Sequence, residues 1–450
     1  MPPKKIFFTP LGCAKNQVDG ELMLGRALSE GHERVTSADD ADVLVVNTCA
    51  FIDAAREESV DAILALARVK AEREGRRLVV TGCLAERYGS ELAREIPEID
   101  AMVGTGALDR FSEALGAEGG AMFRGGKHYL PSALMERVIT DSDGSAYVKV
   151  SEGCDHECSF CVIPQIRGRH ESRPLDDVAA EVERLAVSGI VEVNLIAQDL
   201  SAYGRDLGLQ EGLAQLLYRV GRMSGIERVR CFYLYPNTLT DAAIEAMARV
   251  ETVCKYVDMP LQHADSEVLR RMRRARDADA LRRIIDRVRD RLGDPVLRTA
   301  FITGFPGETD AAFERLLRFI EEVRFDHLAA FRYSHEEGSV AAELDGRVPR
   351  HVAEFRRDRL LSVQEPIAEE RRARWIGRRV PVLVCGKDED GAWYGRTEGQ
   401  APEIDGVTWL EGDVSNLQGR TVEVVICGSD AQDLYAEPVG QPPDFSRSRC

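Results

Sequence analysis

The stretch "EGCDHECSFC", from Glu152 to Cys161, places three cysteines within eight residues. It directly follows "AYVKVS", an apolar run that predicts a buried strand. Cys154, Cys158 and Cys161 have the spacing C-x3-C-x2-C, so one short loop presents three thiols. Three thiolates suit one face of a cubane iron–sulfur cluster, and the fourth iron is then left open to a small chelating molecule.

A zinc site is the alternative for this loop, because His156 lies within it and completes a set of three cysteines and one histidine. Structural zinc sites usually take their ligands as two pairs separated by a longer loop, which is absent here. The spacing therefore favours an iron–sulfur cluster.

Three further cysteines come directly after predicted strands in the first hundred residues: Cys13 in "LGCAKN", Cys49 in "VNTCAF" and Cys83 in "VTGCLA". Residues just past the carboxyl ends of parallel strands meet at one crevice, so these thiols are expected to converge on a second cluster with an open iron. The alternative is that each is a small buried hydrophobe. That is the interpretation given to four cysteines elsewhere, Cys231, Cys254, Cys385 and Cys427.

The pattern of elements predicts an α/β protein with three domains. Residues 1–125 alternate short Val/Leu/Ile strands with helices, which is typical of an open parallel sheet, and the Gly-rich stretch 106–143 is interpreted as an irregular connection. Six β/α units within 135–375 predict a partial, TIM-like barrel. Residues 376–440 have the short strands and turns of a small all-β domain, and 441–450 are expected to be a disordered tail.

Composition limits the functional classes. Eleven cysteines in 450 residues are too few for a disulfide scaffold, and neither a signal peptide nor a membrane-spanning stretch is apparent, so the cytoplasm is the expected compartment. The formal net charge is −17, so the chain does not have the broad basic surface of a protein that binds nucleic acid through its phosphates. A chain this acidic would instead attract a basic protein partner.

The three-cysteine loop after the first barrel strand resembles the radical S-adenosylmethionine superfamily. The resemblance implies that Cys154, Cys158 and Cys161 hold a 4Fe-4S cluster whose open iron chelates S-adenosylmethionine. An electron from the cluster then yields a 5′-deoxyadenosyl radical, so an electron donor is an implied partner. Phe160 would lie near the adenine.

Two three-cysteine sites and a terminal β domain together resemble the methylthiotransferases, from Ile6 to about Glu437. The motifs that carry this are "LGCAKNQVDGE", "SEGCDHECSFCVIPQIRGRHESR", "MPLQHADSEVLRRMRR" and "TGFPGET". The resemblance implies a second 4Fe-4S cluster on Cys13, Cys49 and Cys83, and a C-terminal TRAM domain. Gly20 stands where the family motif leads us to expect serine.

Two branches of that family are candidates: one modifies a tRNA adenosine, and the other an aspartate β-carbon of ribosomal protein S-twelve. "GCAKNQVDGE" and "CVIPQIRGRHESR" resemble the ribosomal branch. Residues 376–440 contain twelve acidic against five basic side chains, which disfavours tRNA and favours a basic ribosomal protein. The alternative interpretation is that these acidic side chains simply form a solvated face of the domain. An alternative function of a different class is an RNA-binding module in which the clusters are only structural. The acidity of residues 376–440 argues against this alternative as well.

Four residues at predicted barrel-strand ends are candidate cofactor or substrate contacts, with hydrogen-bonded rim residues as the alternative: Gln198, Gln262, His263 and Thr303. The basic run "RRMRRAR", Arg270 to Arg276, is interpreted as the solvated face of a helix rather than a contact for an acidic partner.

Overall fold

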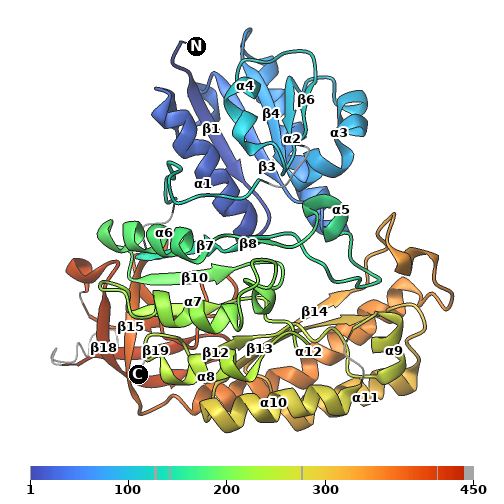
Figure 1. Ribbon diagram of the computed structural model, residues 1–450, viewed down its shortest axis with the longest axis vertical. Coiled ribbons are helices and arrows are strands. Elements are labelled where there is room, and N and C mark those ends of the chain that lie inside the picture. Colours follow the sequence, from blue (N-terminus) through green and yellow to red (C-terminus); the bar gives the residue numbers. More distant parts are fainter. Residues whose placement is uncertain (1, 126–128, 141–142, 275–276, 413, 440–450) are drawn as a thin grey trace.

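The computed structural model describes residues 2–125, 129–140, 143–274, 277–412 and 414–439. Figure 1 shows an N-terminal α/β unit stacked on a larger β/α unit, with a small β unit beside the latter. Among the described helices, none has both the length and the apolar character needed to cross a lipid bilayer. The predicted tail 441–450 and Cys450 lie outside the described residues.

The N-terminal unit is a six-stranded parallel sheet in the order β2-β1-β3-β4-β5-β6. Its strands are β1 (Lys5–Pro10), β2 (Glu33–Val35), β3 (Val43–Thr48), β4 (Arg77–Gly82), β5 (Ala101–Val103) and β6 (Ala121–Phe123). Every residue of β3 is buried, which explains its unbroken apolar run. Helices α1 (Ala14–Ser29) and α4 (Phe111–Ala114) pack on one face, and α2 (Asp53–Ala71) and α3 (Cys83–Glu95) on the other.

The stretch 106–143 is more regular than predicted. It contains α4 and the edge strand β6, which pairs with β5. Both elements are too short for a hydrophobic period to be visible in the sequence. The sheet therefore extends one strand beyond the predicted ones at each edge, with β6 at one edge and β2 at the other.

The central unit is an open barrel of six parallel strands. Two three-stranded sheets, β11-β10-β7 and β12-β13-β14, are joined by a bridge between Val229 and Val253. The strands are β7 (Ser145–Lys149), β10 (Glu192–Ile196), β11 (Arg228–Cys231), β12 (Tyr256–Asp258), β13 (Val296–Thr303) and β14 (His327–Arg332). These are the six predicted β/α units, and the partial barrel is confirmed.

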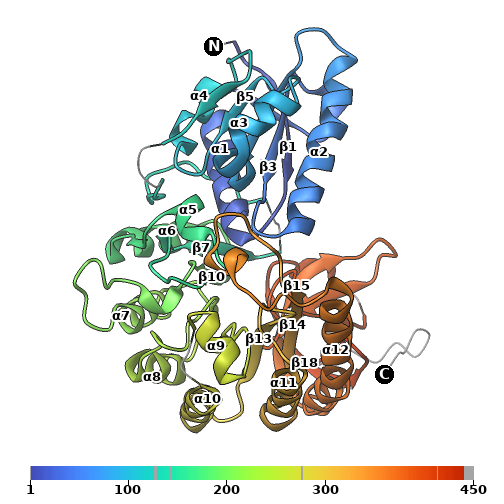
Figure 2. The same cartoon turned by 90° about the vertical axis from the view of Figure 1, so that its right-hand side faces the viewer.

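Helices form the outer layer of this barrel, as Figure 2 shows. They are α6 (Leu175–Val187), α7 (Gly212–Val220), α8 (Asp241–Arg249), α9 (Ser266–Arg271), α10 (Ala278–Leu292), α11 (Asp310–Val323) and α12 (Arg350–Ala373). Between β7 and α6 the chain forms a short hairpin of β8 (Ser151–Glu152) and β9 (Glu171–Ser172), and α5 (Ile163–Arg167) lies between these two strands.

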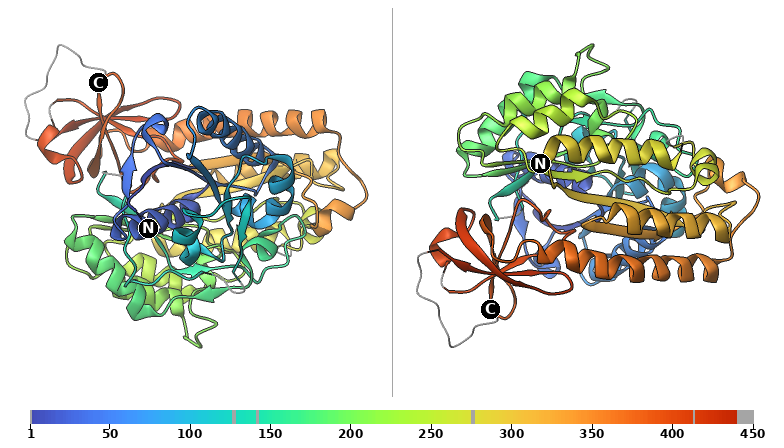
Figure 3. Two further views of the ribbon diagram at one scale, coloured as in Figure 1. Left: turned by 90° about the horizontal axis from the view of Figure 1, so that it is seen from above. Right: turned by 90° about the horizontal axis from the view of Figure 1, so that it is seen from below.

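The C-terminal unit is a small closed barrel in the order β15-β16-β17-β19-β18, which confirms the predicted all-β domain. Its strands are β15 (Arg379–Lys387), β16 (Trp393–Arg396), β17 (Thr408–Leu410), β18 (Thr421–Ser429) and β19 (Leu434–Pro438). Figure 3 shows this unit projecting to one side of the central barrel. The N-terminal sheet and the C-terminal barrel thus contact different parts of the central unit.

Candidate active site

The first cysteine site lies at the carboxyl edge of the N-terminal sheet. Cys13 follows β1 and caps α1, Cys49 follows β3, and Cys83 follows β4 as the first residue of α3. All three are free thiols; Cys13 is exposed and the other two are buried. Gly12, with φ +99°, allows the close approach: a Cβ there would lie 3.0 Å from Cys49 Cβ.

Asn16, three residues after Cys13, ties the three cysteine-bearing loops together. Its Nδ2 donates to Thr48 O, at 2.7 Å, in the residue before Cys49. Its Oδ1 accepts from the Cys83 thiol, at 3.6 Å. Because one buried amide contacts segments from three strands, it fixes how the thiols face one another.

The three thiols differ in how readily they ionise. Burial raises the pKa of Cys83 to about 12, despite the nearby Arg167, and also raises the pKa of Cys49. Desolvation opposes ionisation of Cys13, but the cations Lys15 and Arg167 outweigh it and lower its pKa. Since the thiolate is the metal-binding form, binding of iron here must release protons.

The second cysteine site is the loop after β8. Its backbone is anchored on both sides: Cys154 N donates to Gly168 O at 2.9 Å, and Ser159 N donates to Met272 O at 3.0 Å. Arg274 Nη1 lies 3.5 Å from Cys158 Sγ. Burial raises the pKa of Cys154 to about 11 and that of Cys161 to about 12. The loop thus presents three free, partly buried thiols at fixed positions.

His156 does not complete a zinc site. Its ring stacks on Tyr235 with centroids 3.7 Å apart, and its Nε2 lies 2.7 Å from Asp199 Oδ2. Within the described residues, no three His, Cys, Asp or Glu side chains converge closely enough to hold a single metal ion. Three thiols without a fourth ligand fit a cubane, whose irons take one protein ligand each, better than they fit tetrahedral zinc.

A buried charge network lies between the two sites. Arg167 Nη1, from α5, lies 3.0 Å from both Asp19 Oδ2 of α1 and Glu152 Oε2 of β8. Lys149, from β7, pairs with the same two carboxylates. Two cations balance two anions, so the charges compensate one another in an environment where a lone charge is costly. Arg167 Nη2 also donates to Cys83 Sγ at 3.4 Å, which connects the network to the first site.

The predicted strand-end contacts fall into two groups. Gln198 donates to Glu152 Oε1 at 2.5 Å, and its own Oε1 is buried without a hydrogen-bond partner in the described part of the chain. Gln262 is half-buried in a left-handed conformation, φ 73°. Phe160 packs edge-on against Phe305.

The other two predicted contacts are satisfied within the protein. Both ring nitrogens of His263 are engaged, by Glu308 Oε1 at 3.2 Å and by Asp265 N at 2.9 Å. The Thr303 hydroxyl donates to Ala353 O at 2.9 Å. Both residues are buried, and these contacts resemble the hydrogen-bonded rim residues of the alternative interpretation.

The basic run after α9 corrects one prediction. Helix α9 ends at Arg271, and Arg273 adopts a left-handed conformation, φ 53°. This turn directs Arg274 to Cys158 and over the ring of Tyr235, 4.1 Å from its centroid. The run is therefore not simply a solvated helix face; Arg276 lies outside the described residues.

Four further residues near these sites were not predicted from the sequence: Lys15, Asp19, Lys149 and Arg167. Their signal in the sequence is weak, because Asp19 and Lys149 are 130 residues apart and no local pattern links them.

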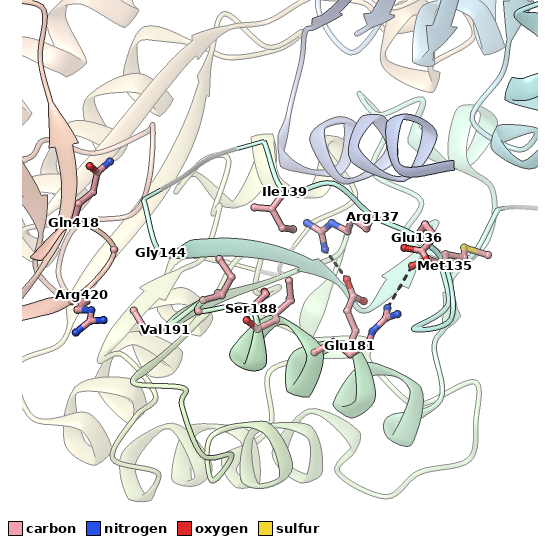
Figure 4. Close-up of a pocket in the computed structure, with 15 residues that line it drawn as sticks. Met135, Glu136, Arg137, Ile139, Gly144, Glu181, Ser188, Val191, Gln418 and Arg420 are labelled. Carbon is pink, nitrogen blue, oxygen red and sulfur yellow. Dashed lines mark hydrogen bonds and ion pairs between the residues drawn. The ribbon is translucent and has the colours of Figure 1, made fainter. Parts of the chain in front are cut away.

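The cavity of about 780 Å³ shown in Figure 4 lies away from both cysteine sites. Its lining comes from residues 135–144, from α6 with the residues after it, and from the loop before β18, and includes Arg137, Glu181 and Arg420. Arg137 is paired with Glu21 and Glu181. No cysteine of either site lines this cavity, so it is not the place of the chemistry.

An open β/α barrel with a three-cysteine loop defines a radical S-adenosylmethionine enzyme. Residues 148–320 match the Radical SAM superfamily, residues 5–104 the uncharacterized protein family UPF0004, and residues 376–439 the TRAM domain. The chain belongs to the family of ribosomal protein uS12 methylthiotransferases named RimO, on the similarity of the following relatives.

The RimO of Sorangium cellulosum (strain So ce56) is 47% identical, over 97% of this chain and 91% of that protein. The RimO of Anaeromyxobacter sp. (strain K) is 44% identical, over 98% of this chain and 94% of that protein. Among solved structures, the radical S-adenosylmethionine methyltransferase TsrM from Kitasatospora setae has a TM-score of 0.53 at 16% identity, over 73% of this chain and 72% of that chain, which is a likeness of fold.

Proposed function

We propose that this chain transfers a methylthio group to the β-carbon of an aspartate in ribosomal protein uS12. The observation that carries the proposal is the presence of two separate three-thiol sites joined by one buried charge network. Relatives at 44–47% identity are named for this activity. A ribosomal substrate would place the reaction in the cytoplasm.

In this proposal Cys154, Cys158 and Cys161 hold one 4Fe-4S cluster, and Cys13, Cys49 and Cys83 hold the other. When bound, the clusters and S-adenosylmethionine would supply the radical, sulfur and methyl chemistry, with an external one-electron donor. The chain's own residues fix and shield these groups. Asn16 orders the first site, the anchored loop orders the second, and the Arg167–Asp19–Glu152–Lys149 network holds the two at a fixed separation.

Two side chains are suited to contact the cofactor at the second site. Gln198 has a buried carbonyl oxygen with no partner among the described residues, which is the state of an acceptor that awaits a ligand donor. Phe160, half-buried beside Cys161, offers an apolar surface for the adenine.

The charge of the C-terminal domain supports a protein substrate. Twelve acidic against five basic side chains in residues 376–440 would repel a tRNA backbone and attract a basic ribosomal protein. Modification of a tRNA adenosine is the alternative activity, and the experiment below distinguishes it from modification of uS12.

The test combines metal content with products. Anaerobically purified protein should contain iron and sulfide for two cubanes, and Cys158→Ala and Cys49→Ala variants should each lose one. With S-adenosylmethionine and a reductant, uS12 should gain the mass of one methylthio group less the one hydrogen that it replaces, and tRNA nucleosides should not change. The Cys49→Ala variant should still release 5′-deoxyadenosine but transfer no sulfur. Zinc in place of iron, or modification of tRNA alone, would refute the proposal.

A further inference from the structure

Lys15, two residues after Cys13, is a buried cation that pairs with no carboxylate in the described part of the chain. The residue is only 7% exposed. Its Nζ lies over the ring of Tyr233, 3.2 Å from the centroid, and within the described residues it makes no hydrogen bond or ion pair with a carboxylate. The neighbouring buried cations differ, because Lys149 and Arg167 each pair with both Asp19 and Glu152.

The carboxylates nearest to Lys15 are committed to other partners. Glu152 is held by Lys149, Arg167 and Gln198. Asp258 lies 3.0 Å from Arg298 Nη1 and accepts from Tyr233 N at 2.9 Å. A buried ammonium that has an aromatic ring and the Cys13 thiol beside it, but no carboxylate, keeps much of its desolvation cost, and an incoming carboxylate would offset that cost.

Tyr233 is held in an uncommon backbone conformation. It follows β11 with φ 60°, in the left-handed region, and its backbone is fixed by Asp258 and by Leu200 N, which donates to Tyr233 O at 3.1 Å. A strained non-glycine residue maintained by its surroundings is typical of functional sites. Here it places an aromatic ring under the ammonium, next to the exposed Cys13.

We infer that Lys15 binds the side-chain carboxylate of the substrate aspartate and is the residue that selects aspartate over asparagine. The inference rests on the proposed function and deepens it. An ammonium–carboxylate contact between α1 and the barrel would hold the neighbouring β-carbon beside Cys13. The carboxylate of S-adenosylmethionine has the same chemistry, so the test must separate the two sources.

The test measures binding by the full-length, anaerobically reconstituted protein. Fluorescence anisotropy would give the Kd of a labelled uS12 peptide with its target aspartate, and of the same peptide with asparagine. The native chain should prefer aspartate by roughly 10- to 100-fold, the range expected for a hydrogen bond to a charged group. Lys15→Met should bind both peptides alike, and Lys15→Arg should keep part of the preference.

Lys387→Met is the matched control, because Lys387 also lies over an aromatic ring, Trp393 at 4.7 Å, but in the C-terminal barrel. It should keep the aspartate preference. Iron and sulfide content and thermal unfolding would confirm that each variant is intact. The inference is overturned if Lys15→Met keeps the preference, if that variant loses affinity for S-adenosylmethionine instead, or if the native chain shows none. A native chain that leaves uS12 unmodified would refute the proposed function itself.

Discussion

At the scale of single residues, Arg274 has a geometry that bears on the 4Fe-4S cluster proposed for the loop of Cys154, Cys158 and Cys161. Its guanidinium lies 3.5 Å from Cys158 Sγ and over Tyr235, and Nη2 donates to Pro260 O at 2.5 Å. A cation and donor beside a cluster sulfur stabilises the more negative, reduced cluster. We therefore predict that Arg274→Met lowers the reduction potential of the cluster on this loop, as measured by a potentiometric titration followed by electron paramagnetic resonance.

The neighbouring arginine provides the control for that titration. Arg273 is half-exposed and its nearest acid is Glu157, at 3.7 Å, so Arg273→Met should leave the potential unchanged. Equal potentials for native protein and Arg274→Met would show that the contact with Cys158 has no electrostatic effect on the cluster.

The residues most accessible to sequence analysis were the six cysteines, because a spacing or a strand end marks each of them. Their supporting shell was not accessible. Asn16 contacts Thr48, 32 positions away, and Arg167 contacts Asn16, 151 positions away, and such pairs leave no local pattern. Gly20, unexpected in its motif, has a physical reason: a Cβ there would lie 2.9 Å from the Phe8 ring. The bulk of Phe8 requires the glycine.

At the scale of elements, the loop after β14 joins the N-terminal unit to the barrel through one carboxylate. Glu336 Oε2 lies 2.7 Å from Arg87 Nη1 and 2.5 Å from Arg56 Nη1, and its Oε1 accepts from Ser334 at 2.6 Å. Its side chain is 4% exposed. Two helices of the N-terminal sheet, α2 and α3, are thus fixed to the barrel by a buried ion-pair cluster.

We predict that Glu336→Gln weakens this attachment by about 3 kcal/mol, because Arg87 then loses its carboxylate partner in a buried position and Arg56 keeps only Asp53. Hydrogen exchange should become faster in residues 333–339 and at the start of α2. The salt-bridge partners Arg350 and Glu354 are more exposed, so Glu354→Gln serves as the control and should change little. Unchanged exchange in both variants would mean that other contacts hold the two units together.

Among the elements, the central strands could be predicted from the sequence and the edge strands could not. Buried strands such as β3 were visible as apolar runs, and the six barrel strands alternated with long amphipathic helices. The edge strands β2 and β6 have only three residues each, and all of them except the buried Phe123 are half-buried or exposed, so they carry no such period. Their pairing depends on the strand beside them, which only the folded structure supplies.

At the scale of the whole molecule, the C-terminal barrel contacts the central barrel through the stretch 396–405, the end of β16 and the loop after it, in addition to contacts such as Arg228 Nη2 with Pro381 O and Arg372 Nε with Asp430 O. This stretch meets the amino ends of four strands: Arg228 Nη1 donates to Arg396 O at 2.7 Å, Tyr256 OH to Asp405 at 2.7 Å, and His327 Nε2 lies 3.0 Å from Gly399 O. Glu192, at the start of β10, accepts from Arg396 Nη1 at 2.7 Å. The cysteine sites lie at the opposite, carboxyl ends, so docking and chemistry are separated across the barrel.

This docking should depend on pH through Glu192. Burial opposes its ionisation, but Arg396, Arg230 and Arg228 outweigh it and lower its pKa to about 2. A carboxylate whose pKa is lower in the folded protein contributes stability above its unfolded pKa, about 4.3, and that contribution is lost as the pH falls toward 2. We predict that the C-terminal barrel stays docked at pH 5 and detaches progressively below about pH 4, with a rising radius of gyration in X-ray scattering.

Glu192→Gln isolates this carboxylate, because the amide keeps the shape and removes the titration. The variant should be less stable at neutral pH, since the buried Arg228 and Arg230 lose their carboxylate partner and Arg396 keeps only Asp143. Its stability should also fall less steeply between pH 4 and pH 2 than that of the native chain. An equal acid slope in both proteins would assign the acid sensitivity to other carboxylates, and Asp143, which lies 2.9 Å from Arg396 Nη2, would be the next to replace.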